Sequence, residues 1–442
     1  MKNFVFIKMA FRFLGIGSGK TVSNARKSLF GAVIGIGISI VPLIIVLVVS
    51  DGMIQGITVR TIELGSGHFR LINLRPFAKN CETEKEIKQN LNSDFKNDFF
   101  ENAWIEREGN GLIIGKNGRS GGSIRAVESE FFIENKKASA LLKVIDGTLE
   151  FESEHSAILG AKIAQTLNLK AGDTCRIITL NKNNNGKIVP KASVFTVSGI
   201  VSSGYQELDA LWVFIPLEAG IRILSVNSSL TSILVSTKDP FDEAEMDSLR
   251  FNLNKFLPDD FSVYTWFDLN RSSFTSFKTT KNILLFIMFL IVLVASANIS
   301  SAIVMLVMER RKEIAILKAV GTYPSSVTLA FLFAGFLTSL GGIILGMPLG
   351  ILAALNINGI FAFIENLLNS MQKFFYSFRG GALPLDIHIL DPAYYLQNIP
   401  IVINFKELYI IAAAMLLLSV IVCIIPAMRA SREKPIEIMR KI

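Results

Sequence analysis

Long apolar stretches alternate with polar segments along this chain. Four stretches carry no charged residue: 28–50, 282–308, 319–364 and 408–428. A helix needs about 20 apolar residues to cross the hydrocarbon core of a bilayer, and each stretch is long enough. The pattern predicts an integral membrane protein with four transmembrane helices.

The apolar stretches divide the chain into membrane and aqueous segments. Between the first two spans the pattern changes to a long mixed polar segment, which we expect to fold as a domain of its own. The predicted order is an interfacial helix and linker (1–27), a first span (28–50), an exported α+β domain (51–280), a second span (281–307), a short helix (308–324), a third span (325–357), a loop (358–405), a fourth span (406–428) and a tail (429–442).

Basic residues gather beside the predicted spans and set their orientation. Residues 1–50 contain six Lys or Arg and no Asp or Glu, within a formal charge of +8 for the whole chain. Lys and Arg in short flanking segments stay on the cytoplasmic side. Both termini and 308–324 are therefore expected in the cytoplasm, and 51–280 and 358–405 outside it. Because the charge follows the membrane boundaries, we expect no nucleic-acid partner.

The predicted spans lack the chemistry of ion transport. No Asp, Glu, Lys, Arg or His lies deep within any of them, although such residues usually mark ion pathways and proton relays. This argues against an ion-coupled pump or a channel. Small residues along the first and third spans allow close packing of another helix. They are Gly31, Gly35, Gly37, Gly342, Gly346 and Gly350.

The exported segment mixes short strands with amphipathic helices, which is typical of an α+β domain. The dipeptide Asn185-Gly186 predicts a hairpin, because both residues tolerate positive φ. The other predicted elements are strands at 68–74 and 111–115, helices at 85–95 and 242–255, a strand followed by a helix at 155–169, and a helix at 267–282 that continues into the second span.

The run GSGKT at 17–21 resembles a phosphate-binding loop but lacks its context. Such a loop needs a glycine five residues before Gly19, where Leu14 stands, and a hydrophobic strand before the loop. Here a basic segment leads into a membrane span instead. We interpret GSGKT as a flexible connection and expect this chain to bind no nucleotide and no metal.

Candidate catalytic residues are also sparse. His68, His155 and His388 lie far apart and none has a metal-ligand spacing, so each is interpreted as structural. We therefore expect a chain that is not an enzyme. Cys81 and Cys175 share the exported segment and could pair in an oxidising compartment, but their spacing does not decide it.

The segment 308–321, MERRKEIAILKAVG, is the most informative motif. It mixes charges with an apolar stripe of Ile314, Leu317 and Val320, and it ends at Gly321, a residue suited to a helix C-cap. A plain connector between two spans would need only polar turn residues. An amphipathic helix at this place could instead sit in a groove of another protein and transmit force into both attached spans.

At this motif the chain resembles the FtsX-type permeases of ABC transporters, also called the MacB-like superfamily. The tail IPAMRASREKPIEIMR (425–440) and the four-span layout agree with that family. Within it, the Lol-type lipoprotein-releasing permeases are the most similar. The segments that carry this resemblance are FIKMAFRFL, GHFRL, ILGAKIAQTLNLKAGDTCRIITL, VFTVSGIVSSGYQELDALWVFIPLEAG and TTKNILLFIMFLIVLVASANISSAIVMLVMERRKEIAIL.

The resemblance implies a fold and a set of partners. The fold is a membrane α-helical protein with four transmembrane helices and a large α+β extracytoplasmic domain of two subdomains, one of them near 148–235. The partners are ABC ATPase subunits, which bind the ATP and Mg, and a second permease subunit, identical or paralogous. The residues expected to couple to the ATPase are Glu309, Arg310, Arg311, Lys312, Glu313, Ile314, Leu317 and Gly321.

The resemblance also suggests two further contacts. In one Lol-type paralogue a hairpin hooks the periplasmic lipoprotein carrier, and the matching residues here are Asn185, Gly186, Lys187 and Pro190. A plain hairpin tip is the alternative interpretation. The lipid-anchored substrate and membrane lipid are expected near the outer end of the first span, at Val48, Met53 and Ile57.

The resulting hypothesis is an inner-membrane permease subunit that releases lipoproteins toward a periplasmic carrier, using ATP hydrolysed by its partner. Two alternatives stay open from the sequence. One is a MacB-like efflux permease, and the other is a cell-division-type signalling permease that moves no substrate.

Overall fold

The computed structural model describes residues 8–11, 24–74, 81–93, 95, 97–182, 188–226, 228–379, 396 and 399–432. The chain divides into two compact units. A helical unit comprises 1–52, 277–385 and 399–442, and a sheet domain comprises 53–276 and 386–398. The GSGKT run and the tail beyond residue 432 lie outside the described residues.

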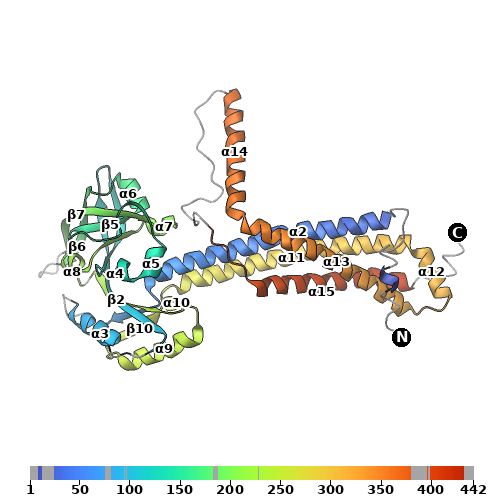
Figure 1. The fold of residues 1–442 in the computed structure, drawn as a ribbon, viewed down its shortest axis with the longest axis horizontal. Coiled ribbons are helices and arrows are strands. Elements are labelled where there is room, and N and C mark those ends of the chain that lie inside the picture. Colours follow the sequence, from blue (N-terminus) through green and yellow to red (C-terminus); the bar gives the residue numbers. More distant parts are fainter. Residues whose placement is uncertain are drawn as a thin grey trace. The chain divides into compact units, whose positions relative to one another are not determined.

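The helical unit consists mainly of long helices, of which α2, α11, α13 and α15 run side by side (Figure 1). Four of them are long and apolar enough to cross a membrane, as the sequence predicts. The helices are α2 (Asn24–Thr61), α11 (Arg271–Glu309), α12 (Arg311–Ala319), α13 (Pro324–Leu355), α14 (Ile357–Arg379) and α15 (Phe405–Arg432). Both α2 and α11 extend beyond their apolar stretches into the sheet domain.

Glycines let α2 and α13 pack backbone to backbone. A Cβ atom built on Gly346 would lie 2.6 Å from the carbonyl oxygen of Gly37, and one on Gly342 would lie 2.7 Å from Cβ of Ile36. Small residues at a helix crossing are what membrane helices use to approach closely. Of the predicted glycines, Gly37, Gly342, Gly346 and Gly350 therefore serve packing within the subunit, whereas a Cβ on Gly31 or Gly35 would meet nothing within 4 Å.

The sheet domain is built on one ten-stranded sheet, in the order β10-β1-β9-β2-β3-β8-β5-β7-β4, with β6 pairing β2 and β7. Its strands are β1 (Phe69–Asn73), β2 (Phe100–Ile114), β3 (Arg119–Val127), β4 (Lys143–Gly147), β5 (Ser156–Gly160), β6 (Thr174–Lys182), β7 (Ile188–Ser202), β8 (Trp212–Pro216), β9 (Ser229–Thr237) and β10 (Phe261–Thr265). Two pairs are parallel, β3 with β8 and β5 with β7.

Helices pack on this sheet, with α3 against β2 and β9, α9 against β10, α6 against β3, β5 and β7, and α8 against β2, β3 and β8. They are α3 (Glu82–Ser93), α4 (Phe131–Glu134), α5 (Lys136–Ala140), α6 (Ala161–Leu167), α7 (Gln206–Asp209), α8 (Leu217–Ile223), α9 (Glu243–Phe256) and α10 (Trp266–Leu269). The predicted strand at 68–74, the helices at 85–95 and 242–255, and the strand and helix of 155–169 are confirmed.

Two sequence interpretations are now sharper. Cys81 and Cys175 are both free and buried, so the open possibility of a disulfide is not realised. Burial raises the pKa of the Cys175 thiol to about 11, which keeps it protonated and unreactive. The predicted strand at 111–115 is only the end of the much longer β2.

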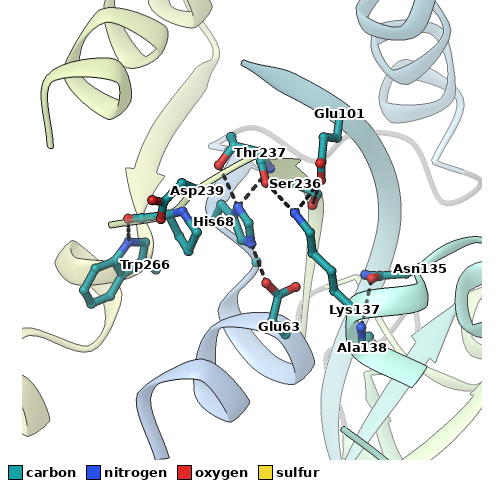
Figure 2. Close-up of polar contacts among 12 residues, drawn as sticks. Glu63, His68, Glu101, Asn135, Lys137, Ala138, Ser236, Thr237, Asp239 and Trp266 are labelled. Carbon is teal, nitrogen blue, oxygen red and sulfur yellow. Dashed lines mark hydrogen bonds and ion pairs between the residues drawn. The ribbon is translucent and has the colours of Figure 1, made fainter. Parts of the chain in front are cut away.

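Helix α2 continues into a π-helical turn, η2 (Ile62–Ser66), which leads to β1. Figure 2 shows His68 at this junction, with its ring between Glu63 and Thr237. The backbone N–H of Thr237 donates to Nδ1 over 2.9 Å, so Nε2 carries the proton and donates to Glu63 Oε1 over 3.0 Å. His68 is buried and structural, and it fixes the end of α2 to β9.

A buried charged network holds the same junction. Glu106 is fully buried on β2, and its two oxygens accept from Arg125 Nε over 2.5 Å and from Arg70 Nη2 over 2.6 Å. Arg125 also donates to the carbonyl oxygens of Leu64 and Gly65, the last turn of η2. Carbonyl groups at a helix end have no partner within the helix, and here a buried guanidinium satisfies them.

Candidate functional site

The short helix α12 (Arg311–Ala319) forms the predicted link between two membrane helices. It starts after a break at Arg310, whose Nη1 donates to Glu313 Oε1 over 2.6 Å. It ends at Ala319 with Val320 as its C-cap, and Gly321 follows with a φ of +99°. The N–H of Thr322 donates to the carbonyl of Leu317 over 3.0 Å, closing the turn of a Schellman motif. Gly321 thus ends the helix as the sequence predicts, one residue beyond the C-cap.

One face of α12 packs on the helical unit. Ile314 and Ala315 are buried, and Leu317 packs against the same cluster of helix side chains. Lys318 Nζ donates to the carbonyl oxygen of Ser431 at the end of α15. The helix is therefore held against α15 and does not hang as a free loop.

The opposite face of α12 is apolar and exposed. Ile316 is 58% exposed, Val320 82% and Tyr323 69%. Ile316 and Val320 lie four residues apart at the end of the helix, whereas Tyr323 follows the left-handed Gly321 and precedes α13. Together they present exposed apolar surface of the kind that docks in a protein groove. Arg311, Lys312 and Glu309 are exposed at the start of this segment. We call Ile316, Val320 and Tyr323 the outer ridge.

The predicted stripe is corrected by this geometry. Of Ile314, Leu317 and Val320, the first two face inward and only Val320 lies on the outer ridge. Ile316 was missed, because 3.6-residue periodicity fits either stripe equally well. Which stripe faces out depends on the break at Arg310, and no local sequence signal reports that angle.

The expected lipid-contact residues lie on α2. Val48 is buried in the helical unit, Met53 is buried, and Ile57 is half-buried. Val48 and Met53 thus offer little surface in this conformation. Beside them, Lys281 Nζ on α11 donates over 2.7 Å to both Asp51 Oδ1 on α2 and Glu407 Oε1 on α15. This ionic triad joins three helices at the boundaries of their apolar stretches.

The predicted carrier hook falls on the β6–β7 hairpin, whose register pairs Lys182 with Ile188. The hairpin itself is confirmed. Asn185, Gly186 and Lys187 lie outside the described residues, whereas Pro190 is exposed on β7 opposite Leu180. The hook role of these residues stays a prediction.

Within the described ranges, no group of three or more His, Cys, Asp and Glu is arranged to hold a metal ion. His155 lies against Phe195 with ring centroids 5.9 Å apart.

Two protein-family models match this chain over different residue ranges. Residues 29–249 match the family model of the MacB-like periplasmic core domain, and residues 285–435 match that of the FtsX-like permease C-terminal domain. The first match alone covers half of the 442 residues.

Curated relatives match this chain over most of its length or over about two thirds of it. The lipoprotein-releasing system transmembrane protein LolC of Neisseria meningitidis is 25% identical over 92% of this chain and 93% of its own length. LolC of Haemophilus influenzae is 24% identical over 96% and 94%, and LolE of that organism is 25% identical over 66% of each chain. This chain belongs to the permease family in which a MacB-like periplasmic core domain is followed by an FtsX-like permease domain.

Proposed function

We propose that this chain is the permease subunit of an ABC system that releases lipoproteins from the inner membrane. The support is the extent of its likeness to proteins named for lipoprotein release, which runs through both domains. Extraction of an acyl chain costs about 0.8 kcal/mol per methylene removed from the bilayer. Two or three chains need far more energy than protein contacts provide, so an ATPase must drive the step.

The outer ridge on α12 is the observation that carries the coupling role. Three large exposed apolar side chains, at the end of a short helix and in the turn that follows it, form a surface for a protein groove. The groove belongs to an ABC ATPase subunit, which binds ATP and Mg. Because α12 is joined to α11 and α13, a push on the ridge moves both membrane helices.

The remaining proposed partners are a second permease subunit, a lipoprotein carrier and the lipid-anchored substrate. A second permease subunit, identical or paralogous, pairs with this one in the inner membrane, with both termini cytoplasmic and the sheet domain periplasmic. The sheet domain acts as two subdomains, one of them near 148–235. The β6–β7 hairpin meets the lipoprotein carrier, and lipid-anchored substrate reaches the outer ends of α2 and α11 near Val48, Met53 and Ile57.

Two measurements test this function. Depletion of the chain should leave lipoproteins in the inner membrane, and normal sorting in a cell without a paralogue would overturn the release function. For the ridge, the double variant Ile316→Asp with Val320→Asp should weaken copurification of the ATPase roughly 10- to 100-fold, as loss of central interface anchors does.

The matched control is Ile316→Leu with Val320→Leu, which keeps the apolar surface and should copurify normally. Membrane insertion of both variants is checked in parallel. An unchanged amount of ATPase with the Asp variant would remove the coupling role from the outer ridge and leave the release function to be judged by depletion.

A further inference from the structure

Helix α14 (Ile357–Arg379) is a 23-residue element in the segment that the sequence analysis treats as a loop. It begins one residue after the C-cap of α13, Asn356. Because α13 starts next to α12 and crosses the membrane, α14 begins at the opposite, outer membrane boundary. Figure 1 shows α14 running across the long helices of the helical unit and not along them.

The start of α14 is firmly held. The side-chain amide of Asn358 donates to the carbonyl of Ile399 and accepts from the N–H of Ile399, both over 3.1 Å. Ile357 is buried. These contacts tie the helix to the segment that enters α15, so its direction at the outer boundary is set by the helical unit.

The two faces of α14 differ in chemistry. Apolar residues recur at i, i+3, i+4 and i+7, the spacing of an amphipathic helix. The apolar face comprises Ile360, Phe363, Ile364, Leu367, Leu368 and Met371. The other face comprises Glu365, Asn366, Asn369, Ser370, Gln372 and Lys373. The apolar face carries no charge, and its central side chains are exposed: Phe363 by 67%, Leu367 by 48% and Met371 by 49%.

We propose that α14 lies in the outer interface of the membrane, with Phe363, Leu367 and Met371 inserted between lipids. Three observations favour lipid over a protein as the occupant. The helix continues directly from a membrane-spanning helix, it runs across the bundle as an interfacial helix must, and it separates a charge-free face from a polar one. Helices of this kind bury the apolar face at the level where headgroups meet acyl chains.

This placement has a consequence for the membrane around the subunit. An inserted amphipathic helix occupies space among the headgroups and leaves the acyl chains below it less tightly packed. The outer leaflet beside the subunit would then be loosened at the level from which a lipid-anchored substrate has to be lifted. The proposal rests on membrane insertion of the four long helices and does not require lipoprotein to be the substrate.

Site-directed spin labelling of the full chain tests the proposal. The chain is reconstituted in vesicles of phosphatidylethanolamine and phosphatidylglycerol, with a label on Cys substituted at 363, 367 or 371 and, as the matched set, at 366 or 369. Cys81, Cys175 and Cys423 are buried, and the unsubstituted chain measures any label that they take up.

Labels on the apolar face should collide several-fold more often with oxygen, which enriches in lipid, relative to a water-soluble nickel chelate. Labels at 366 and 369 should show the reverse ratio. Equal ratios on the two faces would overturn the proposal. Protection of the apolar face from both reagents would also overturn it, because the face would then be covered by protein.

A second variant keeps the test informative if single labels perturb the helix. Phe363→Glu with Leu367→Glu should move the label at 371 into water, whereas Asn366→Glu with Asn369→Glu should leave it in lipid. Gel filtration in detergent checks that both variants stay folded. A label that stays in lipid in both double variants would contradict an inserted apolar face.

Discussion

The two units of this molecule use opposite means to fix one element against another. In the helical unit, α2 and α13 meet through Gly37, Gly342 and Gly346, with backbone against backbone. In the sheet domain, the junction of η2 with the sheet is held by Glu106 and Arg125 inside an otherwise apolar core.

The solvents of the two units explain the difference. Water drives apolar side chains of the sheet domain together without direction, so charged pairs can add orientation at a chosen place. Lipid gives no such drive between helices, and packing must then come from close contact of small residues. In the helical unit, the ionic triad Asp51, Lys281 and Glu407 lies at the ends of the apolar stretches.

The strongest test of this contrast removes the centre of the buried network. Glu106→Gln leaves Arg125 and Arg70 buried with one negative charge fewer, and breaking such a pair typically costs about 3–5 kcal/mol. We expect a loss of that size in the free energy of unfolding of the sheet domain, measured by urea titration of the purified chain.

Its control is Glu101→Gln, which removes the exposed partner of Lys137 drawn in Figure 2. Exposed pairs contribute about 0–1 kcal/mol, so this variant should unfold almost like the unchanged chain. Equal losses for Glu101 and Glu106 would mean that burial does not decide the strength of these pairs.

The second test widens the helix contact. Gly346→Val puts a branched side chain where a Cβ already meets Gly37 at 2.6 Å from its oxygen and 2.8 Å from its Cα. The helices must separate, and overpacking of this kind costs about 1–3 kcal/mol. The expected result is a lower melting temperature of the helical unit in detergent.

Gly35→Val provides the comparison, because a Cβ at Gly35 meets nothing within 4 Å. It should melt close to the unchanged chain. If both valines lower the melting temperature alike, the loss comes from helix propensity or lipid contact and not from the approach of α2 to α13.

The contrast also explains how far the sequence could predict this molecule. Membrane helices follow from charge-free runs, so α2, α11, α13 and α15 were found, and the N-G hairpin follows from local φ preferences. The pairing of Glu106 with Arg125 has no local signal, because β3 brings the two residues together only when the sheet forms.

In the candidate site, too, the sequence predicts local features but not those that depend on packing. Gly321 was predicted because a C-cap is a local property, whereas the choice between Ile314 and Ile316 as the outward residue depends on packing against α15. Helix α14 was missed because its first residues belong to the charge-free run 319–364, which hides where one helix ends and the next begins.

The third test concerns the ionic triad of Asp51, Lys281 and Glu407, which joins α2, α11 and α15. Lys281→Gln leaves Asp51 and Glu407 facing each other without the shared ammonium group. Their side chains are only partly exposed, at 11% and 23%, so we expect a loss of about 1–2 kcal/mol, between the values for exposed and buried pairs. Thermal melting in detergent measures it.

Lys278→Gln changes the same charge three residues earlier, at an exposed position. It should have no measurable effect on melting. A loss for Lys278→Gln as large as that for Lys281→Gln would show that net charge near the membrane, and not the triad, sets the stability.

The smallest expected effect comes from Glu108 in the buried network, and it separates the contribution of the charge from that of the packing. Burial alone would raise the pKa of Glu108, but Arg125 and Arg70 outweigh it and hold the pKa below its usual value. The stability contributed by the Glu108 carboxylate is therefore full above its unfolded pKa, about 4.3, and is lost as the pH falls through the lower folded value.

In Glu108→Gln this acid-dependent part should be missing, at a cost of about 1 kcal/mol at neutral pH. Urea titrations at falling pH compare the two chains, and the difference between them should shrink below pH ~4 as the carboxylate takes up its proton. A difference that stays constant with pH would mean that Glu108 acts by its shape and hydrogen bonds, leaving Glu106 as the group whose charge orients the junction.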